Sequence, residues 1–335
     1  MHRFDVGKLP HDVLSKMISK LPIIHDDVVV APKIGEDAAV IDLGDRYLVV
    51  ASDPITFTAK DIGFYLVTIN ANDIAVMGAK PRYLIVTLLL PENLTDAELV
   101  NKIFDSIASA SRSLEVSVIG GHTEITYGID RPIAIGTMLG FAPKGRLITS
   151  SNAKVGDVIL LTKGIAIEGT SIIAKEKGEE LGRIFGKELV EKAAKFTAEP
   201  GISVVREALI AAETGCVHAM HDPTEGGLAT ALFELATASD VGLLISLEDI
   251  PIYRETREFC RYFHIDPLGL LASGALLIVV PPECAESVES AVLSNGIPVR
   301  RIGEIKPKDF GLKMLKDGKL ADLPVYHRDE LTKIL

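Results

Sequence analysis

The sequence predicts an α+β protein made of two α/β lobes. Segments rich in valine, isoleucine and leucine alternate with amphipathic helical stretches along the chain, which is typical of α/β and α+β folds. The 335 residues suffice for two domains at about 150 residues each. Because 47% of the residues are hydrophobic and 24% are charged, we expect an ordinary globular protein in which each lobe buries its own core.

The first lobe is expected to hold four strands and two helices. Short apolar runs predict the strands, at residues 47–51, 83–90, 116–119 and 133–141. Apolar residues at helical spacing predict helices over residues 61–77 and 95–113, the second with Thr95 as its N-cap. The strand at 116–119 runs into Gly120 and Gly121.

Residues 142–156 are rich in loop-forming residues and form the candidate junction between the lobes. We therefore place the domains at residues 1–148 and 149–335. In the second lobe the same criteria predict strands at 158–162 and 275–280, and helices at 169–177, 189–196, 201–213 and 226–239. Gly215 is the expected C-terminal cap of the third of these helices.

Charge and hydropathy exclude several classes of partner. The chain carries 35 basic and 46 acidic residues, and its net charge of −11 gives no attraction to nucleic acid or to an anionic lipid surface. The longest apolar run, 268–280, is interrupted by Ser273 and two glycines and is shorter than the ~20 residues of a membrane helix. No signal peptide is visible. We expect a cytoplasmic protein.

The cysteines and histidines show no metal-binding spacing. Cys216, Cys260 and Cys284 are far apart and form no C-x-x-C pair, which indicates reduced, buried thiols rather than a zinc cluster. His218 and His221 are three residues apart, but no third ligand follows at a conventional spacing. Structural roles are therefore favoured for both histidines.

Three aspartates recur beside expected strand ends and turns in the first lobe: Asp37, Asp53 and Asp73. Several carboxylates in one cleft would repel each other, so a cation is expected between them. Their oxygens favour Mg²⁺, which usually works together with substrate phosphates. Taken one at a time, each aspartate is explained as well by capping a helix or a turn.

Two glycine-containing segments are candidate phosphate sites. Gly120 and Gly121 follow a strand, where backbone N–H groups can approach a ligand closely, although a plain β-turn explains the pair as well. The segment 222–227 precedes a helix and supplies an aspartate, a threonine and two glycines at its N-terminus, which suits an anion. The alternative for this segment is a capping box with a tight turn. The chain contains neither a Walker A sequence nor a G-x-G-x-x-G motif after a strand.

Taken in order, these segments resemble the aminoimidazole ribonucleotide (AIR) synthetase-related superfamily. The superfamily includes thiamine monophosphate kinase, selenophosphate synthetase and the hydrogenase-maturation protein HypE. The matching segments are residues 35–39, 52–53, 72–81, 120–123 and 222–227. The run 72–81 is the most specific of them, and the likeness is greatest to HypE-like members.

The resemblance implies an N-terminal α/β domain whose sheet pairs with that of a second copy to form a barrel across a homodimer. A C-terminal α/β domain would cover a cleft that holds ATP and Mg²⁺. By this likeness the metal ligands are Asp37, Asp53 and Asp73, with Glu36, Glu124 and Glu225 as further candidates. The nucleotide or its phosphates would contact Gly120, Gly121, Thr123, Asp222, Thr224, Gly226 and Gly227. No catalytic base is identified, and Asp53 and Asp222 are candidates because they should line the cleft.

Departures from the family pattern narrow the expected activity. HypE carries its substrate on a C-terminal cysteine, whereas the last cysteine here, Cys284, stands fifty-one residues before the end of the sequence. An acid, Glu225, stands where HypE usually has arginine. We therefore expect an ATP-dependent enzyme that phosphorylates or activates an oxygen of a small or protein-borne substrate without the carrier chemistry. The alternative is a nucleotide-binding assembly or regulatory protein that acts by docking to a partner.

Overall fold

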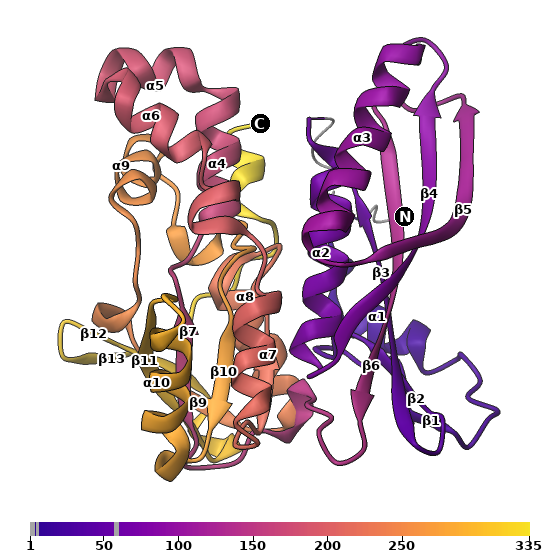
Figure 1. The fold of residues 1–335 in the computed structure, drawn as a ribbon. Coiled ribbons are helices and arrows are strands. Elements are labelled where there is room, and N and C mark those ends of the chain that lie inside the picture. Colours follow the sequence, from indigo (N-terminus) through magenta and orange to yellow (C-terminus); the bar gives the residue numbers. More distant parts are fainter. Residues whose placement is uncertain (1–3, 5–6, 57–59) are drawn as a thin grey trace. The chain divides into compact units, whose positions relative to one another are not determined.

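The computed structural model describes residue 4 and residues 7–56 and 60–335, which form two compact units (Figure 1). The N-terminal unit contains Ile23–Ala31 and Asp37–Leu147. The C-terminal unit contains the described residues up to Pro22, then Pro32–Glu36 and Ile148–Leu335. Residues from both ends of the sequence therefore pack in the C-terminal unit.

The N-terminal unit is built on a six-stranded sheet in the order β1-β2-β3-β6-β4-β5. The strands are β1 (Val28–Val30), β2 (Ala39–Asp42), β3 (Arg46–Ile55), β4 (Lys80–Pro91), β5 (Ser117–Thr126) and β6 (Ile133–Pro143). Neighbouring strands are antiparallel except β4 and β5. These two run parallel, so the chain returns through the helix α3 (Ala97–Ser113) between them.

Two helices pack together in the N-terminal unit. The helix α2 (Ile62–Val76) contacts β3, β6 and β4 as well as α3, and it is buried along nearly its whole length. In contrast, α3 is amphipathic and buries Ile103, Ile107 and Ala110. This difference explains the sequences: α2 lies between other elements and is buried on all sides, whereas α3 keeps a solvent face.

The C-terminal unit has a seven-stranded sheet in the order β13-β12-β9-β11-β7-β10-β8. Its strands are β7 (Val158–Thr162), β8 (Ala219–His221), β9 (Gly242–Ser246), β10 (Leu277–Val280), β11 (Val299–Lys306), β12 (Leu312–Lys316) and β13 (Lys319–Asp322). Its helices are α1 (His11–Ile18), α4 (Ile167–Glu176), α5 (Gly178–Phe185), α6 (Lys187–Ala194), α7 (Val205–Glu213), α8 (Gly227–Ser239), α9 (Arg254–Phe263) and α10 (Ala285–Ser294). The strands pair antiparallel except β9 and β12, which are parallel.

Two hydrophobic clusters stabilise the C-terminal unit. The larger one joins the sheet to α8 and includes Leu161 of β7 and Leu232 of α8. The second joins α4, α6 and α9 and includes Phe259. Leu331, close to the end of the chain, is buried in this second cluster. The C-terminal segment is thus part of the folded unit.

Most predicted strands and helices are present, with displaced ends. β3 continues to Ile55, so Asp53 lies inside a strand rather than after one. α7 begins at Val205 instead of residue 201, because Thr197–Gly201 forms a separate helical turn. The sequence analysis did not find the helices α1, α5, α9 and α10 or the strands β1, β2, β8, β9, β11, β12 and β13.

The expectation of three reduced cysteines is wrong for two of them. Cys216 and Cys284 form a disulfide with their Cα atoms 6.0 Å apart. The antiparallel register of Val279 with Ala219 brings the residues just before β8 beside those just after β10. Sequence spacing contains no sign of this pairing. Cys260 is a free, buried thiol whose pKa is raised to about 12 by burial, which fits the expected role of a small hydrophobe.

No helix among the described residues is both long enough and apolar enough to cross a membrane.

The N-cap of α3 also differs from the expectation. Asp96, not Thr95, caps the helix: its Oδ1 accepts a hydrogen bond from the Leu99 N–H at 2.8 Å. The Thr95 hydroxyl instead donates to the Pro91 carbonyl at 2.6 Å. The difference arises because the turn after β4 uses Thr95, which moves the helix start one residue along the chain.

We expect Asp96→Ala to lower the free energy of unfolding by about 1 kcal/mol, because the first turn of α3 loses its side-chain acceptor. Urea denaturation of the full chain measures the change. Asp105→Ala removes an exposed carboxylate from the middle of the same helix and should not destabilise the protein. Equal losses in both variants would contradict the assignment of the cap.

Candidate functional site

Asp53 is fixed through its backbone. β2 pairs with β3 only as far as Val50, so the rest of β3 has no strand on that side. The side chain of Asn70, from α2, takes the place of a strand. Its Oδ1 accepts from the Asp53 N–H at 2.9 Å, and its Nδ2 donates to the Asp53 carbonyl at 3.3 Å. Because Asn70 is fully buried, this pairing sets the direction in which the Asp53 side chain leaves the strand.

Asp73 and Asp37 approach the same part of the N-terminal unit. Asp73 is buried on α2, three residues after Asn70 and therefore on the same helix face. Asp37 lies two residues before the start of β2, whose ladder with β3 ends at the pair Ala39 and Val50. The antiparallel direction brings Asp37 towards the end of β3 that carries Asp53. The three predicted aspartates thus lie on or beside β3 and α2, but they do not form a three-ligand metal group among the described residues.

Glu36 makes a contact within the C-terminal unit. Its two carboxylate oxygens accept hydrogen bonds from the backbone N–H groups of Ser150 at 3.2 Å and of Ser151 at 3.1 Å. These residues begin a short helical turn, Ser150–Asn152. Glu36 therefore caps this helical turn, which is the role that the sequence offers as the alternative to metal binding for a single acid.

Gly120 and Gly121 lie inside β5, so the β-turn considered for them is wrong. Gly121 has a φ of +150°, and a Cβ atom there would overlap the Val86 carbonyl of β4. Glycine at this position therefore permits close pairing of β4 and β5. The strand was predicted to end at residue 119 because glycine pairs are more common in turns.

The residues after these glycines alternate between the two faces of β5. His122 and Glu124 are two residues apart and share a face, with His122 Nε2 3.7 Å from Glu124 Oε2. Thr123 points to the opposite face. All three are exposed, and β5 is an edge strand of its sheet. Because these side chains lie on opposite faces, Thr123 and Glu124 can contact the same ligand only if that ligand lies at the exposed edge of β5.

The segment from Asp222 to Gly227 forms one compact loop between β8 and α8. Asp222 follows β8 directly and is buried. The Thr224 carbonyl accepts from the N–H groups of Gly227 at 3.1 Å and Ala272 at 3.2 Å. The tight turn is present, but the capping box is not: the N-cap is Gly226, which has no side chain and adopts the left-handed conformation.

Sequence reasoning missed Asp329, which fastens this loop to the C-terminal segment. Its Oδ2 accepts from the Gly226 N–H at 2.7 Å, and its Oδ1 from the Leu331 and Leu271 N–H groups at 2.8 and 3.2 Å. Burial raises the pKa of Asp329 to about 6, although these hydrogen bonds oppose the shift. The only local signal was an aspartate at the start of a short helical turn.

Glu168 is a second buried acid in the same neighbourhood. It lies in the first turn of α4, and burial raises its pKa to about 7, while a hydrogen bond from Ser273 acts in the opposite direction. Segment 271–273 thus contacts Thr224 through Ala272, Asp329 through Leu271 and Glu168 through Ser273. A carboxyl group with such a pKa can gain or lose a proton near neutral pH.

Both histidines pair with acids. His218 Nδ1 lies 2.8 Å from Asp157 Oδ2, and His221 Nε2 lies 3.2 Å from Glu234 Oε2. Burial alone would raise the pKa of Glu234. Hydrogen bonds from His11 and His221 together with the charge of Lys8 outweigh burial and hold this pKa well below its usual range. Among the described residues, no three His, Cys, Asp or Glu side chains form a group that could hold a metal ion by themselves.

Known proteins resemble both units of this chain. The models for the N-terminal and C-terminal domains of AIR synthase related proteins match residues 35–142 and 154–313. Carbamoyl dehydratase HypE of Rhizobium leguminosarum bv. viciae is 30% identical over 83% of this chain and 79% of its own length. The chain belongs to the AIR synthase related family. The resemblance that the ordered segments predicted is therefore confirmed.

Other relatives come from two branches of this family. Thiamine-monophosphate kinase of Pyrococcus abyssi is 30% identical over 87% of this chain and 88% of its own. A crystal structure of the hydrogenase maturation protein HypE in complex with ATP is 26% identical, with a TM-score of 0.73 over 88% of this chain and 89% of that one. The α+β fold of AIR synthase related proteins is confirmed, and the sheet of a single chain is open rather than a closed barrel.

The raised pKa of Glu168 predicts a pH-dependent stability. In the unfolded chain Glu168 loses its proton near its ordinary pKa of 4.5, whereas in the folded protein it keeps the proton up to about pH 7. The folded state therefore binds more protons between these values, and its stability falls as the pH rises through them. We expect Glu168 to account for a loss of roughly 3 kcal/mol between pH 4.5 and pH 7.

Denaturation of the wild type and of Glu168→Gln at a series of pH values measures this contribution. The variant should lose less stability than the wild type as the pH rises, whereas Glu188→Gln, an exposed acid on α6, should follow the wild-type curve. Parallel curves for the wild type and Glu168→Gln would show that Glu168 ionises normally in the folded protein.

Proposed function

We propose that the chain is a Mg²⁺- and ATP-dependent enzyme that phosphorylates or activates an oxygen of a small substrate. The observation that carries this proposal is the fixed position of Asp53, clamped by buried Asn70 beside the helix that supplies Asp73. Both aspartates lie in segments through which the chain matches its family, and a HypE that is 26% identical has been solved with ATP. Pre-set carboxylates of this kind suit a metal-bound triphosphate.

In this proposal Asp37, Asp53 and Asp73 hold the metal. Their carboxylate oxygens are the ligands that Mg²⁺ prefers, and one or two protein carboxylates suffice because phosphates and water complete its shell. When bound, Mg²⁺ neutralises charge on the phosphoryl group that is transferred. Asn70 keeps Asp53 in position, so little ordering is needed when the nucleotide binds. Glu124 and Glu225 remain further candidate ligands.

The phosphates are proposed to contact backbone N–H groups in two places. One is Gly120 and Gly121 on β5, with the Thr123 hydroxyl. The other is the loop of Asp222 and Thr224 at the start of α8. The N–H groups of Gly226 and Gly227 already donate to Asp329 and to the Thr224 carbonyl, so these two glycines contribute by leaving the helix N-terminus without bulky side chains. In the transfer, a substrate oxygen bonds to the γ-phosphorus, the bond from that phosphorus to the bridging oxygen breaks, and ADP leaves. The substrate hydroxyl loses its proton, for which Asp53 and Asp222 are the candidate acceptors.

Asp53→Asn should reduce Mg-ATP turnover at least a hundredfold, because the metal loses a charged ligand. The fold should be retained, since Asn70 binds only the backbone of Asp53. Phosphate release and thermal melting measure the two effects. Asp105→Asn, on the exposed face of α3, is the matched control and should change neither. An unchanged rate in Asp53→Asn would exclude this site.

Turnover also separates the enzyme from a docking protein. Calorimetry should show Mg-ATP binding, and phosphate release should increase with one member of a panel of small metabolites. Tight binding without phosphate release under any condition would count against the enzyme and favour a protein that acts by docking.

We also propose that two copies pair through β5. This edge strand is exposed along its length, and its apolar side chains Val118, Ile119 and Ile125 are 46%, 56% and 58% exposed. A long apolar edge with unpaired backbone groups is covered in most proteins, because it otherwise promotes association. A second copy of the same sheet supplies the complementary edge.

We expect Ile125→Lys to convert a dimer into a monomer, because it places a charge within the proposed interface. Light scattering after size-exclusion chromatography gives the mass. Val155→Lys places the same charge at a site that is 59% exposed in the C-terminal unit and should leave the dimer intact. A wild-type monomer at micromolar concentration would contradict the pairing.

A further inference from the structure

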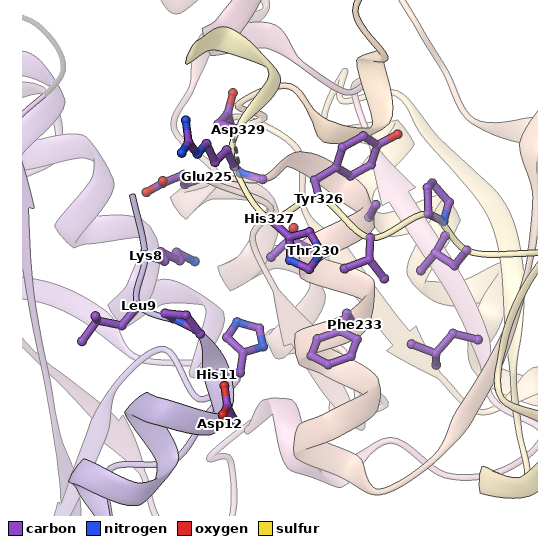
Figure 2. A pocket seen from close by; sticks show the side chains of 18 of the residues that line it. Lys8, Leu9, His11, Asp12, Glu225, Thr230, Phe233, Tyr326, His327 and Asp329 are labelled. Carbon is purple, nitrogen blue, oxygen red and sulfur yellow. Dashed lines mark hydrogen bonds between the residues drawn. The ribbon is translucent and has the colours of Figure 1, made fainter. Parts of the chain in front are cut away.

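The C-terminal unit contains a pocket of about 470 Å³ (Figure 2). Three separate segments form its walls: residues 8–12 near the N-terminus, the Ala229, Thr230 and Phe233 face of α8, and residues 323–329 near the C-terminus. Glu225 and Gly226 close one end. This volume lies in the range of sites that hold small organic molecules.

The walls are held in place by buried acids. Glu234 Oε1 lies 3.2 Å from Lys8 Nζ and 3.6 Å from His11 Nε2, which fastens the N-terminal segment to α8. Asp329 fastens the C-terminal segment to Gly226 and Leu271. The pocket is therefore formed before a ligand arrives, which lowers the entropic cost of binding.

Rings line the pocket on two sides. His11 stacks on Phe233 with ring centroids 5.2 Å apart and an interplanar angle of 28°. Figure 2 shows Tyr326 on another part of the wall, with His327 and Thr230 between it and these rings. Leu9 and Val325 add apolar surface. Such a lining suits an aromatic ring, because stacked and edge-to-face contacts add to the burial of apolar area.

Acids outnumber bases among the charged side chains that line the pocket: Asp12, Glu225 and Asp329 stand against Lys8 and Arg328. Lys8 is paired with Glu234, Arg328 has an interaction partner of its own, and the Asp329 carboxylate accepts three backbone N–H groups. In the described part of the chain, no Lys, Arg or His side chain forms an ion pair with Glu225, and Asp12 adds an exposed acid. A ligand with a cationic group can therefore gain a charge interaction at Glu225 that an anion cannot.

We propose that this pocket binds a small molecule with an aromatic ring and a positively charged amino group. The ring lies against Phe233 and Tyr326, and the amino group lies at Glu225, which on this assignment does not hold the metal. This inference rests on the proposed function in one respect: the bound molecule is the phosphoryl acceptor, so it also carries a hydroxyl oxygen that takes the phosphoryl group. Glu225 lies within the Asp222 to Gly227 loop, so the amino group and this hydroxyl lie beside the proposed phosphate contacts.

Three probes with the same ring and different head groups test the charge preference: tyramine, the neutral tyrosol and the anionic 4-hydroxyphenylacetate. Each is titrated into the full chain without nucleotide or Mg²⁺, and ligand-observed NMR gives the dissociation constants. Tyramine should bind at least tenfold more tightly than 4-hydroxyphenylacetate, with tyrosol between them. Equal affinities, or tighter binding of the anion, would overturn the proposal.

Glu225→Gln should bring the three dissociation constants within about twofold of each other. Glu283→Gln is the matched control: it removes the same charge from an exposed site outside the pocket and should keep the tenfold preference. A preference that survives Glu225→Gln, or is lost in both variants, would show that Glu225 does not recognise the amino group.

Phe233→Ala tests the ring and should weaken all three probes at least fivefold, whereas Thr237→Ala, exposed on the same helix, should not. Because Phe233→Ala also removes core contacts, Val325→Arg gives a second test at a rim position that is 68% exposed. It should weaken tyramine binding at least threefold, and Val155→Arg should not. Unchanged tyramine affinity in folded Val325→Arg would place the probe outside the pocket.

Calorimetry with Mg-ATP separates this inference from the proposed function. Selective tyramine binding in a protein that does not bind Mg-ATP would uphold the pocket and overturn the proposed function. Mg-ATP turnover in a protein that binds none of the three probes would uphold the function and overturn the pocket.

Discussion

The functional segments of this chain are positioned by buried side chains that satisfy backbone groups distant in sequence. A buried N–H or carbonyl without a partner costs free energy, so each place where a strand ladder stops needs another donor or acceptor. Asn70 supplies an acceptor and a donor to the backbone of Asp53, at the point where β2 no longer pairs with β3. The Asp329 carboxylate supplies the acceptors for the N–H groups of Gly226 and Leu271. Without Asn70 and Asp329, the end of β3 and the loop before α8 would not be held in one position.

The same constraint explains why the acids of this chain serve different purposes. Glu36 and Asp329 are engaged by backbone N–H groups, and Glu234 by Lys8, His11 and His221. Their hydrogen bonds offset the cost of burying a carboxylate. Asp53 differs because its backbone, rather than its carboxylate, takes part in the clamp.

Both ends of the sequence contribute to the C-terminal unit, and this arrangement creates its pocket. Lys8 and His11 are fastened to α8 through Glu234, and Leu331 is buried beside Phe259. The segment before Leu331 therefore becomes a wall of the pocket.

The sequence by itself determined the family, the α+β class and about half of the strands and helices. The run 72–81 and the loop 222–227 are local patterns whose residue types and order are sufficient for recognition, and hydrophobic spacing reports burial on one face. Only the tertiary structure decided that Gly120 and Gly121 lie within a strand, that Cys216 pairs with Cys284, and that Asp329 and Glu168 lie near Thr224. These features depend on which strands and loops become neighbours in space. A one-dimensional pattern does not contain that information, because residues far apart in sequence supply the partners.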